Sequence, residues 1–142
     1  MKTDHARQRQ AFENALQELR AGRHADAANL CEDALRFFPD DASTICLAAK
    51  AYLALRQFDH AERHASAATR RFPGFAAAHD VYGDLMLATG RVGRAIEAYE
   101  KTLSLEPARP ATLAKIDRAR QLADGAGGRR QADSQATNRF RG

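Results

Sequence analysis

Three of the four prolines in this 142-residue chain recur at a fixed interval, and this spacing limits the possible folds more than any other feature. Pro39, Pro73 and Pro107 stand 34 residues apart. Two other positions keep the same period, an alanine twelve residues before each proline and a turn position seventeen residues before it: Ala27, Ala61 and Ala95, and Gly22, Arg56 and Gly90. A constant period over three units predicts a stack of structural repeats.

Each unit is expected to form two helices joined by a tight turn. Proline cannot continue a helix interior, so it separates one unit from the next. The repeated alanine allows the two helices of a unit to approach closely. Ala, Leu, Arg, Glu and Gln dominate the composition and favour helix, which predicts an all-α protein. The expected helices are residues 5–20, 24–37, 41–55, 58–71, 75–88, 92–104 and 108–124.

The composition changes after Asp124, where a Gly-rich polar segment begins. This segment has too little apolar surface to offset the entropy lost on ordering. We therefore divide the chain into three parts: an N-terminal extension (1–7), a repeat domain (8–124) and a disordered basic tail (125–142). The repeat domain contains units at about 8–41, 42–75 and 76–109 and a capping helix at about 108–124.

Over residues 8–124 the pattern resembles the tetratricopeptide repeat (TPR), Trp-x2-Leu-Gly-x2-Tyr followed by Ala-x3-Phe and then Pro. The Ala and Pro positions match in every unit, Tyr52 and Gly83 match in single units, and Tyr99 is an aromatic substitute for Phe. The Trp and Leu positions depart from the pattern and hold Ala11, Ile45 and His79, and Asn14, Ala48 and Tyr82. The resemblance implies an all-α, right-handed superhelix of three helix-turn-helix repeats plus a C-terminal capping helix.

The resemblance also implies that the first helix of each unit lines a concave groove, which binds a peptide or an amphipathic helix of a partner protein. The groove side chains that it implies are Phe12, Leu16, Leu19, Arg20, Leu47, Lys50, Leu53, Asp80, Asp84, Leu87 and Arg118.

Two features of this set remain open at the level of sequence. Helical spacing does not separate a groove position from a core position for Leu16 and Leu47. Asp80 and Asp84 lie four residues apart, a like-charge pair that requires nearby cations, and Lys50 and Arg118 are the expected ones. These charges form either a salt-bridge ladder between helices or polar anchors for a ligand.

The sequence predicts no enzyme, cofactor or metal site. His60 and His64 have the spacing of a two-histidine metal face, but they lack a third ligand and are expected on a solvated helix face. His79 lacks an orienting partner and is expected to be a packing residue. The two cysteines form no CxxC; Cys31 is expected to be buried and Cys46 accessible.

The charge distribution disfavours nucleic acid as a partner. The net charge is +4, and the last eighteen residues contribute +3 of it through Arg129, Arg130, Arg139, Arg141 and Asp133. The folded part is therefore nearly neutral. Neither an apolar leader nor a membrane-spanning run is present, so we expect a cytoplasmic protein without a membrane partner. Arginine outnumbers lysine eighteen to four, which favours a bacterial origin.

The leading functional hypothesis is a protein-binding adaptor or scaffold. The first alternative is a dedicated chaperone of a secreted or export-machine subunit, because small bacterial three-repeat proteins of this kind shield such subunits. The second alternative is self-assembly, with another copy filling the groove or the end of the solenoid. The acidic C-termini of heat-shock chaperones are not expected ligands, because Phe12 and Leu16 occupy positions where family members that bind them use Lys and Asn.

Overall fold

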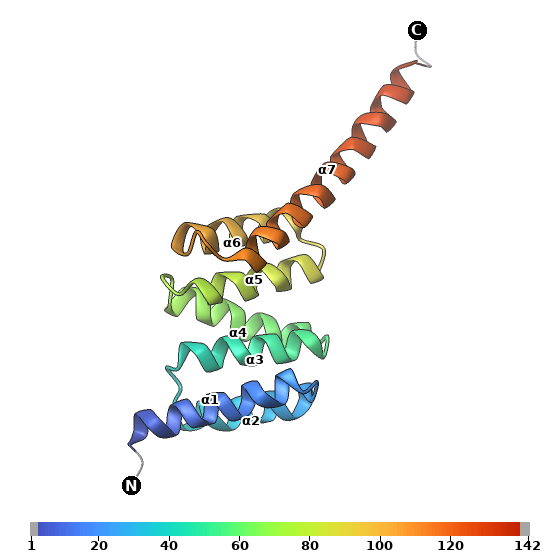
Figure 1. The fold of residues 1–142 in the computed structure, drawn as a ribbon. Coiled ribbons are helices and arrows are strands. Elements are labelled where there is room, and N and C mark those ends of the chain that lie inside the picture. The colour runs from blue at the N-terminus through green and yellow to red at the C-terminus, as the bar shows by residue number, and fades with distance from the viewer. Residues whose placement is uncertain (1–2, 140–142) are drawn as a thin grey trace.

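A computed structural model describes the backbone of residues 3–139 and the side chains of residues 3–125. Over the described backbone the chain forms seven helices and no strand (Figure 1). They are α1 (Asp4–Arg20), α2 (His24–Phe37), α3 (Ala42–Ala54), α4 (Phe58–Arg71), α5 (Ala76–Ala88), α6 (Val92–Leu105) and α7 (Pro110–Arg139). The all-α prediction is confirmed, and the bounds of α1 to α6 lie within one residue of the expected ones. The helix α1 begins inside the expected extension, with Thr3 accepting a hydrogen bond from the Ala6 amide at 3.1 Å.

The tight turn inside each unit has one backbone geometry. Gly22 and Gly90 have φ values of 83° and 80°, and Arg56 has 59° at the equivalent position of the second unit. In the first unit the Arg23 amide donates to the Glu18 carbonyl at 2.9 Å. This bond satisfies a carbonyl that the helix end would otherwise leave without a donor. Glycine adopts the left-handed conformation without steric cost, so Gly22 and Gly90 suit the turn, whereas Arg56 adopts it with a side chain present.

Small side chains set the distance between the helices of a unit. Ala27, Ala61 and Ala95 are completely buried, as their predicted role requires. In the third unit the close contact is made by Gly83, where an added Cβ would lie 2.5 Å from Cε1 of Tyr99. The Tyr99 ring therefore occupies space that any other residue at position 83 would fill.

The units stack in chain order, and each contacts the next (Figure 1). The first helices of successive units pack on one another, α1 on α3 and α3 on α5. Within the described chain no comparable packing joins α2 to α4 or α4 to α6. Because the first helices lie closer together than the second helices, the stack curves and α1, α3 and α5 line its inner side.

The C-terminal segment differs from the expectation. Residues 125–142 were expected to be disordered, but α7 continues to Arg139 and projects away from the body of the solenoid (Figure 1). A helix satisfies its own backbone hydrogen bonds without tertiary partners. Residues 140–142 lie outside the described part of the chain. Among the described helices, none is long and apolar enough to cross a membrane.

Candidate binding groove

The apolar row expected along the inner side is half-buried. Phe12, Leu16 and Leu19 on α1 pack against a buried cluster made of Ala15, Cys31, Leu47 and Ala48. Leu53 on α3 and Leu87 on α5 pack in the same manner against the main core. Each of these five side chains keeps an accessible part. The row therefore combines a structural contact on one side with apolar surface on the other.

Two of the expected groove residues are buried. Leu47 is 3% exposed within the cluster between α1, α2 and α3, so the core interpretation of this residue holds. Asp80 is 4% exposed and lies beneath α7. Neither offers accessible surface to a ligand. Leu16, the other ambiguous leucine, is half-buried.

A polar cluster joins α5 to α7. Asp80 accepts hydrogen bonds from the Thr112 hydroxyl at 2.6 Å and from Lys115 Nζ at 2.9 Å. Asp84 accepts from the same Lys115 at 3.2 Å and from the Tyr99 hydroxyl at 2.7 Å. The cation that compensates the acidic pair is thus Lys115, not the expected Lys50 or Arg118, which form no ion pair within the described chain.

The two carboxyl groups respond differently to the same lysine. Burial alone would raise the pKa of Asp80, but the bonds from Thr112 and Lys115 outweigh it and the pKa lies below its ordinary value. Burial raises the pKa of Asp84 above its ordinary value, because the bonds from Tyr99 and Lys115 offset only part of the effect. Both carboxylates hold the pKa of Lys115 above its ordinary value, against the effect of burial. Asp80 is therefore the better-compensated charge.

The accessible charges of the inner side are mainly positive. Arg9, Arg20, Lys50 and Arg118 are exposed on α1, α3 and α7, and the exposed acid among them is Glu13. At the start of the groove Arg9 and Phe12 line a hollow of about 180 Å³ together with His5, Gln8, Asp41 and Ser43. These four cations form no ion pair within the described chain, so the inner side offers apolar surface next to unpaired positive charge.

Of the two histidines expected on a solvated helix face, His60 is exposed, but the His64 side chain is only 14% exposed. His64 Nε2 lies 2.7 Å from Glu32 Oε1, which also accepts from the Tyr52 hydroxyl at 3.0 Å. The Tyr52 ring stacks on His60 and His64, with centroids 4.9 and 5.7 Å apart. Sequence reasoning missed this cluster because Glu32 lies on the preceding unit. Within the described residues no group of side chains is arranged to hold a metal ion.

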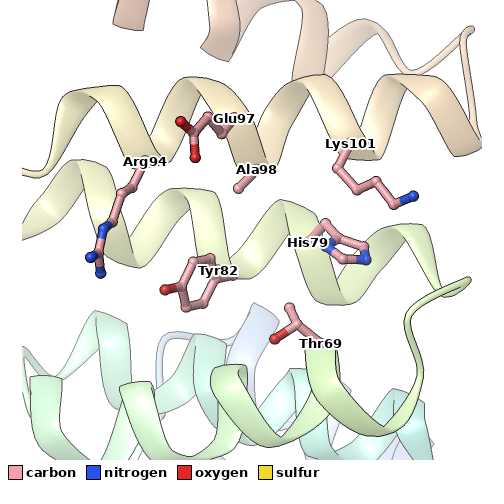
Figure 2. A pocket seen from close by; sticks show the side chains of 7 residues that line it. All are labelled: Thr69, His79, Tyr82, Arg94, Glu97, Ala98 and Lys101. Atoms are coloured by element: carbon pink, nitrogen blue, oxygen red, sulfur yellow. The ribbon is translucent and has the colours of Figure 1, made fainter.

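A second hollow of about 380 Å³ lies on the outer side between α4, α5 and α6 (Figure 2). Arg94, Glu97 and Lys101 extend from α6 around it, and Tyr82 and His79 come from α5. His79 Nε2 donates to the Pro73 carbonyl at 2.8 Å, which fixes the ring in its position. The expected packing role of His79 thus includes a hydrogen bond at the start of α5.

Both cysteines are buried, so the expected accessibility of Cys46 is wrong: this side chain is 4% exposed. Burial raises the pKa of the Cys31 thiol to about 12 and that of Cys46 to about 11. A thiol with so high a pKa carries almost no thiolate at neutral pH, and the thiolate is the reactive form. These cysteines therefore serve as core residues.

Comparison with known proteins supports the repeat assignment. The tetratricopeptide-repeat family model matches residues 46–111. The TPR domain of Sgt2 from Aspergillus fumigatus superposes with a TM-score of 0.80 at 21% identity, covering 85% of this chain and 82% of that one. The first TPR domain of human RPAP3 gives a TM-score of 0.76 at 21% identity, covering 82% and 93%. The first TPR of Spaghetti (RPAP3), solved with the HSP90 peptide SRMEEVD, gives 0.77 at 20% identity, covering 82% and 95%.

At these identities the likeness establishes the fold. The predicted superhelix of three helix-turn-helix repeats plus a capping helix is confirmed. The ligand of the Spaghetti domain is a property of that protein.

Proposed function

We propose that this protein is an adaptor or scaffold that holds a segment of a partner protein in its concave groove. The observation that carries the proposal is the half-buried row of Phe12, Leu16, Leu19, Leu53 and Leu87 beside exposed cations. An amphipathic helix places its apolar side on such a row and its polar side toward the rim. The TPR structure solved with an HSP90 peptide is a precedent for a peptide ligand on this fold.

The charges narrow the chemistry of the partner. Arg20, Lys50 and Arg118 favour a segment with acidic residues along its polar side. Such a segment differs from a chaperone C-terminus, because Phe12 and Leu16 require apolar side chains where family members that bind chaperone tails use Lys and Asn. The proposal assigns no catalytic step and no cofactor.

The test reverses charge in the groove without disturbing the fold. In the double variant Lys50→Glu/Arg118→Glu both positions are exposed, so the folded state should be unaffected. The matched control is Arg94→Glu/Lys101→Glu, which reverses two exposed charges on the outer side (Figure 2). Each protein is used as bait in its native lysate, and captured proteins are compared by quantitative mass spectrometry.

The groove variant should lose the partner and the control should keep it. Equal capture by both variants, or equal loss, would place the partner elsewhere. Leu19→Asp and Leu53→Asp are less suitable for this purpose, because both leucines also pack against the core and a buried carboxylate would destabilise the free protein.

A dedicated chaperone would use the same groove, since an apolar row also shields an aggregation-prone segment of a secreted subunit. The two roles differ in stoichiometry. A chaperone should copurify one-to-one with a single client, whereas a scaffold should hold several different proteins. Self-assembly in which the grooves of two copies face each other is disfavoured, because both grooves carry mainly positive charge.

A further inference from the structure

The first unit exposes apolar surface at the N-terminal end of the solenoid. Phe37, the last residue of α2, is 78% exposed, and Leu30 on the same helix is 36% exposed. Two hollows of about 220 and 390 Å³ meet at Phe37 and Phe38. We use the term end face for the surface formed by Ala11, Leu30, Ala34, Phe37 and Phe38.

In the next unit the equivalent surface contacts the preceding unit. Arg71 lies 34 residues after Phe37; its guanidinium donates to the Pro39 carbonyl at 3.2 Å, and 41% of its side chain stays exposed. Ile45 and Ala48 lie 34 residues after Ala11 and Asn14, and they are 3% and 0% exposed. Leu35 of the preceding unit packs against the core cluster that contains Ile45. Within residues 3–125 no element covers Ala11 and Asn14 in this manner. The end face is therefore a unit-to-unit contact surface that the described chain leaves open.

The charges at the edge of the end face limit what can cover it. Asp4 pairs with Arg7 at 4.0 Å on α1, and Asp33 pairs with Arg36 at 3.9 Å on α2. Both pairs are exposed, and the four charges sum to zero. A surface that meets a strongly acidic or basic partner carries charge of one sign. A surface whose charges sum to zero does not repel a second copy of itself, and in a twofold contact each of its cations has an acid available on the other copy.

We propose that the end face joins two copies of this chain about a twofold axis. Phe37 of each copy enters the hollow beside Phe38 of the other copy. The rotation places Arg7 and Arg36 of one copy opposite Asp33 and Asp4 of the other. The concave groove stays free in this arrangement, so the dimer adds to the proposed function without depending on it. Two grooves on one particle increase the avidity for a partner with repeated segments.

Sedimentation velocity of the full chain, from low-micromolar to sub-millimolar concentration, tests the proposal. The wild-type protein should shift from monomer to dimer and no further. Phe37→Glu should weaken the dimer by about a hundredfold or more, because each dimer loses two buried rings and gains two acids at one contact. Phe37→Leu should retain most of the dimer. Circular dichroism should be unchanged in both, since Phe37 lies on the surface.

A matched control and a charge exchange complete the experiment. Leu122→Glu introduces the same charge at a half-exposed leucine on α7, at the other end of the solenoid, and should leave the dimer intact. Arg36→Glu should weaken the dimer, and adding Asp4→Arg should restore it. A protein that stays monomeric at all concentrations would overturn the proposal. Assemblies that grow beyond the dimer, or equal losses from Phe37→Glu and Leu122→Glu, would also overturn it, because both indicate head-to-tail contact.

Discussion

The first unit and the capping helix α7 are joined to the middle of the solenoid by different chemistry. The first unit contacts α3 through a cluster of small and branched apolar residues, Ala15, Cys31, Leu47 and Ala48. The helix α7 contributes Ile116 and Ala119 to the main core, but it also covers the buried carboxylate of Asp80. The first unit also has charged contacts with the second, Glu32 with His64 and Asp40 with Arg71, but both carboxylates are partly exposed. At α7 the carboxylate of Asp80 is buried inside the junction.

This difference sets what each junction responds to. Apolar contact contributes free energy in proportion to the area removed from water and does not depend on pH. A buried carboxylate is stable only while its donors are present, because removal of one partner leaves the charge without compensation. The attachment of α7 is therefore the part of the fold that a single side chain or a change in pH alters most.

The largest expected effect comes from Lys115→Met, which removes the cation shared by Asp80 and Asp84. The substitution should lower the free energy of unfolding by about 2 to 4 kcal/mol, less than for a fully buried pair because Lys115 is partly exposed. Denaturant titration followed by circular dichroism measures the change. Lys101→Met on α6 removes an exposed lysine and should cost less than about 0.5 kcal/mol. Similar small losses in both variants would mean that Asp80 does not require its cation.

The substitution Ala61→Leu, in the second unit, tests how strongly stability depends on close apolar packing between helices. Ala61 is completely buried between α3 and α4, so the larger side chain should cost about 1 to 3 kcal/mol through overpacking. Ala67→Leu, at a half-buried position of the same helix, should cost clearly less. Equal costs at positions 61 and 67, measured by the same titration, would contradict the assigned helix contact. Unlike the loss in Lys115→Met, the loss in Ala61→Leu should not change with pH.

The pH dependence of the α7 junction follows from Asp80. Its pKa is lowered in the folded protein, so its stabilising contribution is complete above the ordinary Asp pKa of about 3.9 and is lost as pH falls through the folded value. Asp84 has a raised pKa, so its contribution to stability changes with pH in the opposite direction. Asp84 is present in both the wild-type protein and the variant Asp80→Asn, so the comparison between them reports on Asp80. Asp80→Asn should therefore cost about 1 to 2 kcal/mol at neutral pH and less at about pH 3. A cost that is independent of pH would show that only shape matters at this site.

The smallest changes in stability are expected from two glycine substitutions, Gly90→Ala and Gly93→Ala, which lie outside both junctions. Gly90 lies in the α5–α6 turn with φ 80°, and a Cβ added there would meet no atom beyond its chain neighbours within 4 Å, so Gly90→Ala tests backbone conformation alone. It should cost about 1 kcal/mol. Gly93→Ala, three residues later inside α6 and equally open, should instead stabilise the protein by about 0.5 to 1 kcal/mol. Thermal midpoints measured by calorimetry would separate the two signs.

The helices and their register were predictable because they depend on local signals. Proline at the unit boundary, alanine at the helix contact and glycine in the turn each act within a few residues, and the 34-residue period repeats them. The depth of each side chain was not predictable to the same degree. Leu47 and Lys50 both lie on the inner helix α3, yet Leu47 is buried and Lys50 is exposed. Helical spacing gives the direction of a side chain but not how closely the neighbouring helix approaches it.

The polar contacts show the same limit. Spacing alone identifies the acidic pair, but its cation, Lys115, comes from a helix whose angle to α5 is set by packing. The continuation of α7 beyond Asp124 does not follow from composition, because the lack of apolar surface in residues 125–139 favours disorder. The packed part of α7 supplies the nucleus, and elongation of an existing helix adds one internal hydrogen bond per residue without a new nucleation cost.

The position of Asp80 beneath α7 has a consequence for synthesis. A ribosome releases the chain from its N-terminus, so α5 and α6 emerge and pair before α7 is complete. During that interval the carboxylate on α5 keeps its water, and the open end of the unfinished solenoid carries a hydrated acid beside the apolar surface that Ile116 and Ala119 later cover. When α7 docks, Thr112 and Lys115 donate hydrogen bonds to the Asp80 carboxylate and replace that water. The nascent protein thus carries a solubilising carboxylate at its growing end until the docking of α7 buries it.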